Sequence, residues 1–240
     1  MVQNGPWHFY ERMSFADYPP GYMVVLWALG GLRLLLGIGY NTTGHLLLVK
    51  IVPILCDLGL AFVLYRVARP RSAMLGVLLA LFYLFNPAVL TDSAAWGQVD
   101  AVVSLLAVAY LWLIYKEKNI GAGALLAVGV MMKPQMLLFA PLMIVGWVNA
   151  FRQSKGRGWR DLVGSAVAGL AAMLVFVVPF TGGQPWYWIV EKLFSTMGSY
   201  AYGSVNAANL MALLDGLWRA DSDTLLLLSY KTWGYIGIAL

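Results

Sequence analysis

Long apolar runs, separated by short polar segments, make up most of this chain of 240 residues. A helix needs about 20 apolar residues to cross a bilayer, and six stretches approach or exceed that length. Only 11% of the residues are charged, whereas a soluble domain carries about a quarter. Because backbone polar groups in lipid must be satisfied within the chain, we predict an all-α, polytopic transmembrane helical bundle. The candidate spans are residues 45–67, 74–90, 101–115, 120–147, 162–180 and 224 onward.

Basic residues predict how these spans are oriented, because many of them gather in three short segments. The segments are residues 66–71, 116–118 and 152–160. Basic loops tend to remain on the cytoplasmic side of a membrane, so we expect all three segments there, and the formal charge of +5 needs no nucleic acid to explain it. The span 74–90 then crosses the membrane to the outer side, and the span 101–115 returns to the cytoplasmic side. The polar loop 86–100 between them is predicted to lie on the extracytoplasmic face.

The stretch 120–147 must cross an even number of times if the last two basic segments share a side. It is short for two full helices, so we expect two short helices that meet at Lys133-Pro134, where proline breaks the helical hydrogen-bond ladder. The alternative is one proline-kinked span with a snorkelling lysine. That alternative would move residues 152–160 to the outside.

Residues 22–38 are apolar and nearly long enough to span, but Arg33 in their middle makes a crossing costly. We favour a juxtamembrane helix lying in the outer interface, which keeps Asp17 on the same side as the 86–100 loop; a full crossing would place it opposite. Residues 186–197 carry apolar side chains at helical spacing and predict a second, amphipathic helix on the same surface.

We therefore expect one transmembrane domain. Its parts are an external loop with an interfacial helix (1–43), transmembrane helices (44–181), an external loop with an amphipathic helix (182–222) and the start of a further span (223–240). The chain opens on a polar and aromatic segment and stops inside an apolar run. We expect it to be a fragment, incomplete at both ends.

Polar side chains gather on the predicted outer face. They include the carboxylates of Asp17, Asp92 and Asp100 and the lysines Lys133 and, near the outer end of its span, Lys50. Ionisable groups at membrane helices are costly, which makes them functional candidates. Carboxylates that deprotonate a hydroxyl, together with a lysine that holds a phosphate, suit group transfer from a lipid-linked phosphate to a polar acceptor. The structural alternatives are helix caps or solvated helix starts for the acids and snorkelling for the lysine.

Four motifs occur in a distinctive order. They are Asp17-Tyr-Pro-Pro-Gly-Tyr22, the loop that runs from Asp92 to Trp96-Gly-Gln-Val-Asp100, Met132-Lys-Pro-Gln135 and Ser204-Val-Asn-Ala-Ala-Asn209. This set resembles the GT-C glycosyltransferases. More narrowly, the chain is similar to bacterial membrane proteins related to the GPI-anchor mannosyltransferases and to the dolichyl-phosphate-glucose-dependent glucosyltransferases. The resemblance covers essentially the whole chain.

The resemblance implies an all-helical membrane enzyme that moves a hexose, mannose or glucose-like, from a polyprenyl-phosphate donor to a glycan, lipid or protein acceptor with inversion. The active site would face the extracytoplasmic side of the cell membrane, with a bacterial plasma membrane favoured. Asp17 matches the second acidic motif of the family, and the 22–38 segment matches its second juxtamembrane helix. The first acidic motif, which usually supplies the catalytic base, would precede Met1, so we expect this polypeptide to be inactive by itself.

Roles follow for the individual residues. We assign Asp17, Asp92 and Asp100 to the catalytic carboxylates, positioning the acceptor or one another, and Lys133 and Lys50 to the donor phosphate. The expected substrate-binding residues are Tyr18, Trp96, Gln98, Gln135, Asn206 and Asn209. The two asparagines have a structural alternative, which is to satisfy backbone groups in a turn. No cofactor or metal is needed for this chemistry, and the sugar donor is a substrate.

Lys50 and Asp57 also match a basic and acidic pair seen in relatives, and a buried structural pair is the alternative reading of them. Cys56 lies in the same apolar run and is predicted to be a packing residue. His8 and His45 show no metal-ligand spacing and are predicted to be interfacial or structural.

Two other functions compete. A transporter or lipid flippase also uses broken helices with buried lysine and aspartate, but here the polar groups gather on one face and no inverted repeat is visible. A non-catalytic membrane subunit is the third possibility, and it draws its support from the missing acidic motif.

Overall fold

The computed structural model describes residues 1, 4–13, 16–198, 200–205 and 209–239. The chain divides into two compact units, Met1–Ile189 and Val190–Leu240. The first unit contains the helices α1 (Phe9–Arg12), α2 (Pro20–Leu35), α3 (Thr43–Ala68), α4 (Ala73–Leu84), α5 (Pro87–Val89), the π-helix η1 (Leu90–Trp96), α6 (Asp100–Tyr115), α7 (Asn119–Met132), the 3₁₀-helix η2 (Pro134–Phe139), α8 (Pro141–Gln153), α9 (Lys155–Val177) and the 3₁₀-helix η3 (Val178–Phe180).

Three continuous helical stretches in the described residues are long and apolar enough to cross a membrane: Thr43–Ala68, Pro134–Gln153 and Lys155–Phe180. The pair Ala73–Leu84 and Pro87–Trp96, bent by 45° at its break, makes a fourth if it counts as one span. Helices α6 and α7 are shorter, at 16 and 14 residues. The all-helical, membrane-type architecture predicted from the sequence is therefore supported.

The stretch 120–147 folds as two helices that reverse direction at Lys133. That residue is extended (φ −155°, ψ 127°), and the 3₁₀-helix η2 begins directly after it at Pro134. The two helical segments lie close together at the reversal. Met136 is fully buried against Gly129, and a Cβ on this glycine would lie 2.5 Å from Cγ of Met136. The predicted break at Lys133-Pro134 is thus confirmed, whereas the second helical stretch, Pro134–Gln153, is longer than expected at 20 residues.

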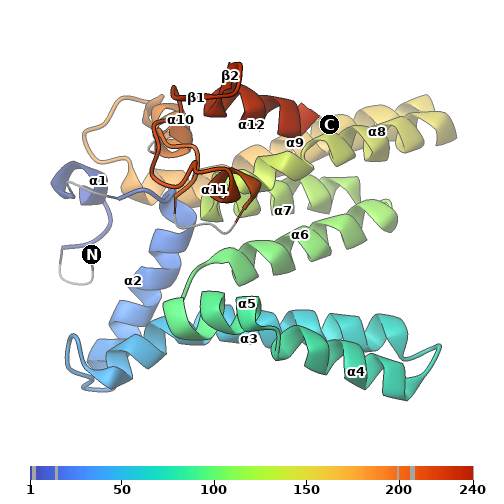
Figure 1. The fold of residues 1–240 in the computed structure, drawn as a ribbon. Coiled ribbons are helices and arrows are strands. Elements are labelled where there is room, and N and C mark those ends of the chain that lie inside the picture. The colour runs from blue at the N-terminus through green and yellow to red at the C-terminus, as the bar shows by residue number, and fades with distance from the viewer. Residues whose placement is uncertain (2–3, 14–15, 199, 206–208, 240) are drawn as a thin grey trace. The chain divides into compact units, whose positions relative to one another are not determined.

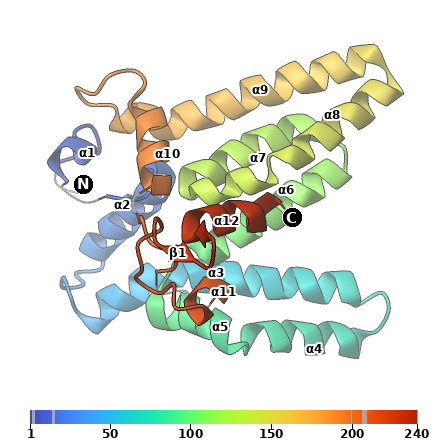
Figure 2. The same ribbon diagram turned by 45° about the horizontal axis from the view of Figure 1, so that its top comes forward.

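The helices of the first unit run back and forth between two ends. Figure 1 and Figure 2 show the α3–α4, α6–α7 and α8–α9 turns at the right-hand end, whereas α6 starts and α7 finishes at the left-hand end. The three basic segments therefore share one end, as predicted, and the acids of the 86–100 segment lie at the other. Which end faces the cytoplasm stays a prediction.

Small residues bring α7 and α9 close together. A Cβ on Gly123 would collide with the carbonyl oxygen of Ser165, and a Cβ on Gly169 would lie 3.1 Å from the carbonyl oxygen of Gly123. Ser165 and Gly169 are four residues apart, so they line one face of α9. Such small-residue faces are the usual way in which membrane helices approach backbone to backbone.

A buried polar network joins the turns at the basic end. The Asn119 amide donates to the Gly146 carbonyl at 3.1 Å and to Asp161 Oδ2 at 3.0 Å. The side chains of Asn119 and Asp161 are almost fully buried. Arg160 donates to the same aspartate at 2.8 Å, and Arg157 pairs with Glu117 at 2.8 Å. No pattern in the sequence indicated this network, which ties the α6–α7 turn to α8 and α9.

Helix α2 runs across the ends of the longer helices rather than beside them (Figure 2). Its first turn packs on the last turn of α7, because a Cβ at Gly21 would lie 2.6 Å from the carbonyl group of Met131. Tyr22 joins a buried cluster with Val99 and Met132, which ties α2 to α6 and α7. Its placement in the outer membrane interface stays a prediction.

The second unit contains the rest of α10 (Trp188–Gly198), α11 (Leu210–Leu213), the hairpin β1 (Thr224–Leu225) and β2 (Leu228–Ser229), and α12 (Tyr230–Ala239). Helix α10 matches the amphipathic helix predicted at 186–197, two residues later. The helix expected from residue 224 begins only at Tyr230. The β1–β2 strand pair takes up the residues before it. The N–H groups of Tyr230 and Lys231, the first two residues of α12, donate to the Asp223 and Asp221 carbonyls at 3.0 and 2.9 Å.

Candidate active site

Most of the 86–100 segment, expected to be a loop, is helical. The Asn86 side chain accepts a hydrogen bond from the Ala88 N–H at 2.9 Å and so starts α5, with Pro87 as its first residue. The helix then widens into the π-helix η1, which ends at Gly97 in the left-handed region (φ 85°). The Gly97 and Gln98 N–H groups both donate to the Asp92 carbonyl, at 2.8 and 3.0 Å. Since π-turns are rare and concentrate at functional sites, this element supports the choice of segment.

Three different elements hold the end of this segment. The Lys50 ammonium group of α3 donates to the Ala95 carbonyl at 2.7 Å, and the Tyr18 hydroxyl donates to Gln98 Oε1 at 3.2 Å. The Lys133 ammonium group, at the break between α7 and η2, forms a salt bridge with Asp100 at the start of α6. Residues far apart in the sequence thus meet around residues 95–100.

The Lys133–Asp100 pair combines a buried cation with a half-exposed anion. The Lys133 side chain is 16% exposed and that of Asp100 is 48% exposed. A charge as buried as that of Lys133 requires a partner, because an unpaired ammonium group is costly in a poorly solvated site. An ammonium group has three donors, so this lysine can hold Asp100 and still bind a second anion.

Asp17 and Tyr18 reach the same region from the segment before α2. The Tyr10 hydroxyl donates to the Tyr18 carbonyl at 2.7 Å, and Pro19 and Pro20 fix the backbone that follows. Burial raises the pKa of Tyr18, and the carboxylates of Asp100, Asp17 and Asp92 raise it further. All three predicted acids therefore act electrostatically on one phenol.

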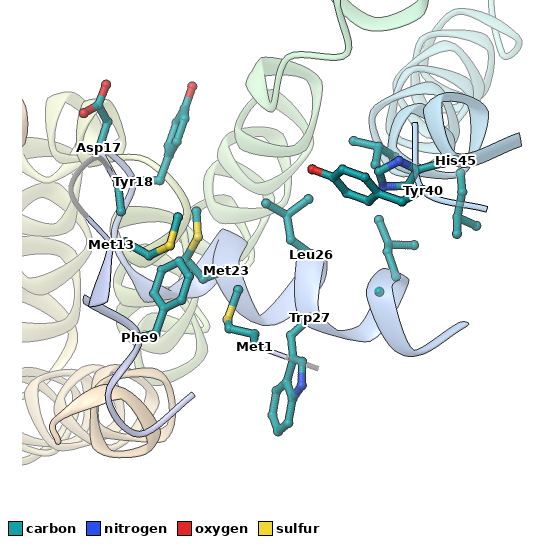
Figure 3. A pocket seen from close by; sticks show the side chains of 15 residues that line it. Met1, Phe9, Met13, Asp17, Tyr18, Met23, Leu26, Trp27, Tyr40 and His45 are labelled. Atoms are coloured by element: carbon teal, nitrogen blue, oxygen red, sulfur yellow. The ribbon is translucent and has the colours of Figure 1, made fainter. Parts of the chain in front are cut away.

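A cavity of about 560 Å³ opens beside Asp17. Figure 3 shows Asp17 and Tyr18, with Phe9 and Met13, on one side of it and Tyr40 and His45 on the other, with Met23, Leu26 and Trp27 between them. Among its described lining residues there is no lysine or arginine. The middle of the cavity is therefore apolar, with a carboxylate at one end and a tyrosine and a histidine at the other, and it suits an uncharged group better than an anion.

Asp92 lies in the first turn of η1 and is half-buried. Within the described part of the chain, no side-chain hydrogen bond engages its carboxylate. It is thus available to accept a proton, whereas the carboxylate of Asp100 already neutralises Lys133. The described residues contain no group of three metal-ligating side chains arranged to hold an ion.

Other predicted residues are placed differently. Trp96 is 58% exposed, and Gln135 is exposed on η2. Asn209 accepts a hydrogen bond from the Ala212 N–H at 2.9 Å and starts α11 in the second unit, which is the structural alternative stated for it. Asn206 lies outside the described residues.

The expected Lys50–Asp57 pair does not form. Asp57 is 5% exposed and accepts a hydrogen bond from the Tyr83 hydroxyl of α4 at 2.7 Å, whereas Lys50 bonds the Ala95 carbonyl. The two residues are seven apart on α3, so they lie on the same side of the helix two turns from each other. Each finds a nearer partner on the 83–96 segment.

The sequence did not indicate the contacts that fix the segment before α2. Glu11 accepts hydrogen bonds from the Gly183 N–H at 2.6 Å and from His8 at 2.8 Å, and these bonds, that of His8 most, hold the pKa of Glu11 below its ordinary value. The glycine pair at 182–183 was a possible signal, because Gly182 is in the left-handed region (φ 53°) and a Cβ there would collide with the Trp7 carbonyl oxygen. The structural role expected for His8 agrees with this contact.

The comparison with known families adds one finding. The model of glycosyltransferase family 87 matches residues 15–239, a range that contains all three carboxylates, both lysines and most of the cavity. No curated protein and no solved structure matches the chain. The chain belongs to glycosyltransferase family 87, and its general activity is accordingly the transfer of a sugar to an acceptor.

Proposed function

We propose that this protein transfers a hexose from a polyprenyl-phosphate donor to a hydroxyl group of its acceptor, with inversion, at the extracytoplasmic face of the cell membrane. One observation carries the proposal. A mostly buried lysine ammonium group forms a salt bridge with Asp100, and the carboxylates of Asp100, Asp17 and Asp92 all act on Tyr18 in the same region, at the end of the bundle away from the basic segments. Family membership supplies the reaction class, and the apolar helices support a donor that resides in the membrane.

Lys133 is the residue assigned to the donor phosphate. When the bond from the anomeric carbon to the phosphate oxygen breaks, negative charge grows on the leaving group. A phosphate leaving group needs little help from a general acid, so a positive charge placed beside it contributes most to the rate. Lys133 has donors to spare beside Asp100, which holds the ammonium group in place before the donor arrives.

The acceptor is placed in the cavity beside Asp17, whereas the donor phosphate is placed at Lys133. Asp17 borders a cavity whose described lining contains no lysine or arginine, which suits an uncharged, hydroxyl-bearing molecule with an apolar part. Asp17 or Asp92 takes the hydroxyl proton as the acceptor oxygen attacks the anomeric carbon, in the role that the family resemblance gives to an acid before Met1. The electron pair of the breaking bond leaves with the polyprenyl phosphate, and a single in-line displacement inverts the anomeric centre.

The test uses the protein in proteoliposomes with radiolabelled polyprenyl-phosphate mannose or glucose and native membrane extract as the source of acceptor. Label should move from the polyprenyl phosphate to the extract, and a nucleotide-activated sugar should not replace this donor. Lys133→Met should lower kcat/KM for the donor by about 100-fold or more, whereas Lys118→Met, at the opposite end, should not. Normal turnover by Lys133→Met would contradict the phosphate assignment, and transfer only from a nucleotide sugar would contradict the donor class.

Sidedness has its own test. Ala94 is exposed on η1, and Gly156 has open space around it in the α8–α9 region. Single cysteines at these positions, made in a Cys56→Ala background, should react with a membrane-impermeant maleimide from opposite sides. Labelling from the same side would contradict the predicted orientation.

A further inference from the structure

We propose that Lys50 is a positioning residue, whose ammonium group holds the end of the π-helix that carries Asp92. This role replaces its assignment to the donor phosphate. The inference rests on the proposed function in so far as Asp92 belongs to the transfer site.

The contact of Lys50 is with the backbone. Its ammonium group donates to the Ala95 carbonyl at 2.7 Å, in the last turn of η1. The last carbonyl groups of a helix lack partners inside the helix and carry its partial negative charge. A lysine at this position satisfies one of those carbonyls and interacts favourably with the helix dipole.

The turn after η1 leaves room for the lysine stem. Gly97 is in the left-handed region (φ 85°), and a Cβ there would lie 3.1 Å from Cγ of Lys50. Gly97 therefore has two functions: it adopts the left-handed backbone conformation, and its missing side chain leaves space for the Lys50 side chain. The helix end and the lysine are fitted to each other.

The position of Asp92 depends on this helix end. The Gly97 and Gln98 N–H groups both donate to the carbonyl of Asp92, so the end of η1 is folded back onto the residue that bears the carboxylate. Gln98 also accepts the hydrogen bond from Tyr18. A π-helix of seven residues has little stability of its own, so loss of the Lys50 contact should loosen Asp92 and Gln98 together.

The two lysines of the site therefore differ in what they hold. Lys133 bonds a carboxylate side chain, which an incoming phosphate can share or replace. Lys50 bonds a peptide carbonyl, which remains in place throughout the reaction. Their substitutions should consequently produce different defects.

The test compares Lys50→Met with Lys133→Met in the whole protein in nanodiscs, by hydrogen exchange of the 90–99 segment and by donor kinetics. Lys50→Met should speed exchange of the Gly97 and Gln98 amides by about tenfold or more, as expected when a hydrogen bond to a charged group is lost. It should lower kcat while the donor KM stays within about threefold of wild type. Lys133→Met should affect the donor kinetics and leave this exchange unchanged.

Further variants keep the test decisive. Lys50→Arg retains a charged donor and should restore most of the protection, while Gly97→Ala should loosen the same amides without adding fully to the effect of Lys50→Met. Unchanged exchange in Lys50→Met, or a raised donor KM with normal exchange, would overturn the positioning role. If the wild-type protein transfers no sugar, the proposed function fails, and the exchange comparison still decides what Lys50 holds.

Discussion

The contact between α2 and α7 can be tested by adding one methyl group. Gly21 is buried in the first turn of α2, and a Cβ there would lie 2.6 Å from the carbonyl carbon and oxygen of Met131 and 2.9 Å from the Met132 nitrogen. These are backbone atoms and cannot rotate away as a flexible side chain can. Gly21→Ala must therefore push the helices apart until the contact reaches the 3.4 Å at which ordinary van der Waals contact begins.

Overpacking of this kind costs about 1–3 kcal/mol. For a chain of this length each kcal/mol lowers the melting temperature by about 2–4 °C, so Gly21→Ala should lower it by roughly 2–12 °C. Gly31 is the matched control, because it lies on the same helix and a Cβ there would meet nothing within 4 Å. Gly31→Ala should leave the melting temperature unchanged or raise it slightly, since alanine favours the helix by about 0.5–1 kcal/mol.

The assay uses the native thiol. Cys56 lies on α3 and packs beside the cluster that contains Tyr22, so it reacts with a fluorogenic maleimide as that region unfolds. Apparent melting temperatures of membrane proteins depend on the heating rate, and all variants must be heated at one rate. A melting temperature for Gly21→Ala as high as that of Gly31→Ala would refute the packing of α2 on the end of α7.

Three further predictions concern other parts of the first unit. Gly123→Ala should lower the apparent melting temperature, because its Cβ would collide with the α9 backbone, whereas Gly121→Ala, with ordinary contacts only, should not. Tyr83→Phe should destabilise the protein by about 1–3 kcal/mol, because the buried Asp57 loses its donor, and adding Asp57→Leu should recover part of the loss. Side chains of α8 and α9 lower the pKa of Glu117 by hydrogen bonding. The wild-type protein should therefore have a higher free energy of unfolding than Glu117→Gln at pH values above 4.5, the ordinary pKa of glutamate, and this difference should vanish as the pH falls through the lowered pKa. A difference in stability that persists at about pH 2 would contradict this.

The broken helix at Lys133 could be predicted because two independent signals agreed. Proline interrupts the backbone hydrogen bonds, and the basic segments on either side of 120–147 required an even number of crossings. The placement of Lys133 and Asp100 at one end then followed from topology, since the start of α6 and the end of α7 had to lie together. Charge patterning thus predicted which residues share an end of the bundle, although it did not predict which of them pair.

The π-helix could not be predicted. Its extra residue per turn leaves no mark in the hydrophobic pattern, and the polar residues of 86–100 indicated a loop. The partners of Lys50 and Asp57 were missed for a related reason. These partners, the Ala95 carbonyl and the Tyr83 hydroxyl, depend on how the bent 83–96 segment lies against α3. A carbonyl group is common to every residue, so nothing in the sequence distinguishes the one that a lysine binds.

The shortness of α6 and α7 helps to explain where the chemistry is placed. At 1.5 Å per residue, helices of 16 and 14 residues are about 24 and 21 Å long, whereas the hydrocarbon core of a bilayer is about 30 Å thick. In the orientation proposed, with the basic turns at the cytoplasmic interface, Asp100 and Lys133 then lie short of the outer interface. Their salt bridge is less screened there than it would be at the surface. A phosphate attached to a lipid can approach that depth, because its polyprenyl chain is already in the bilayer.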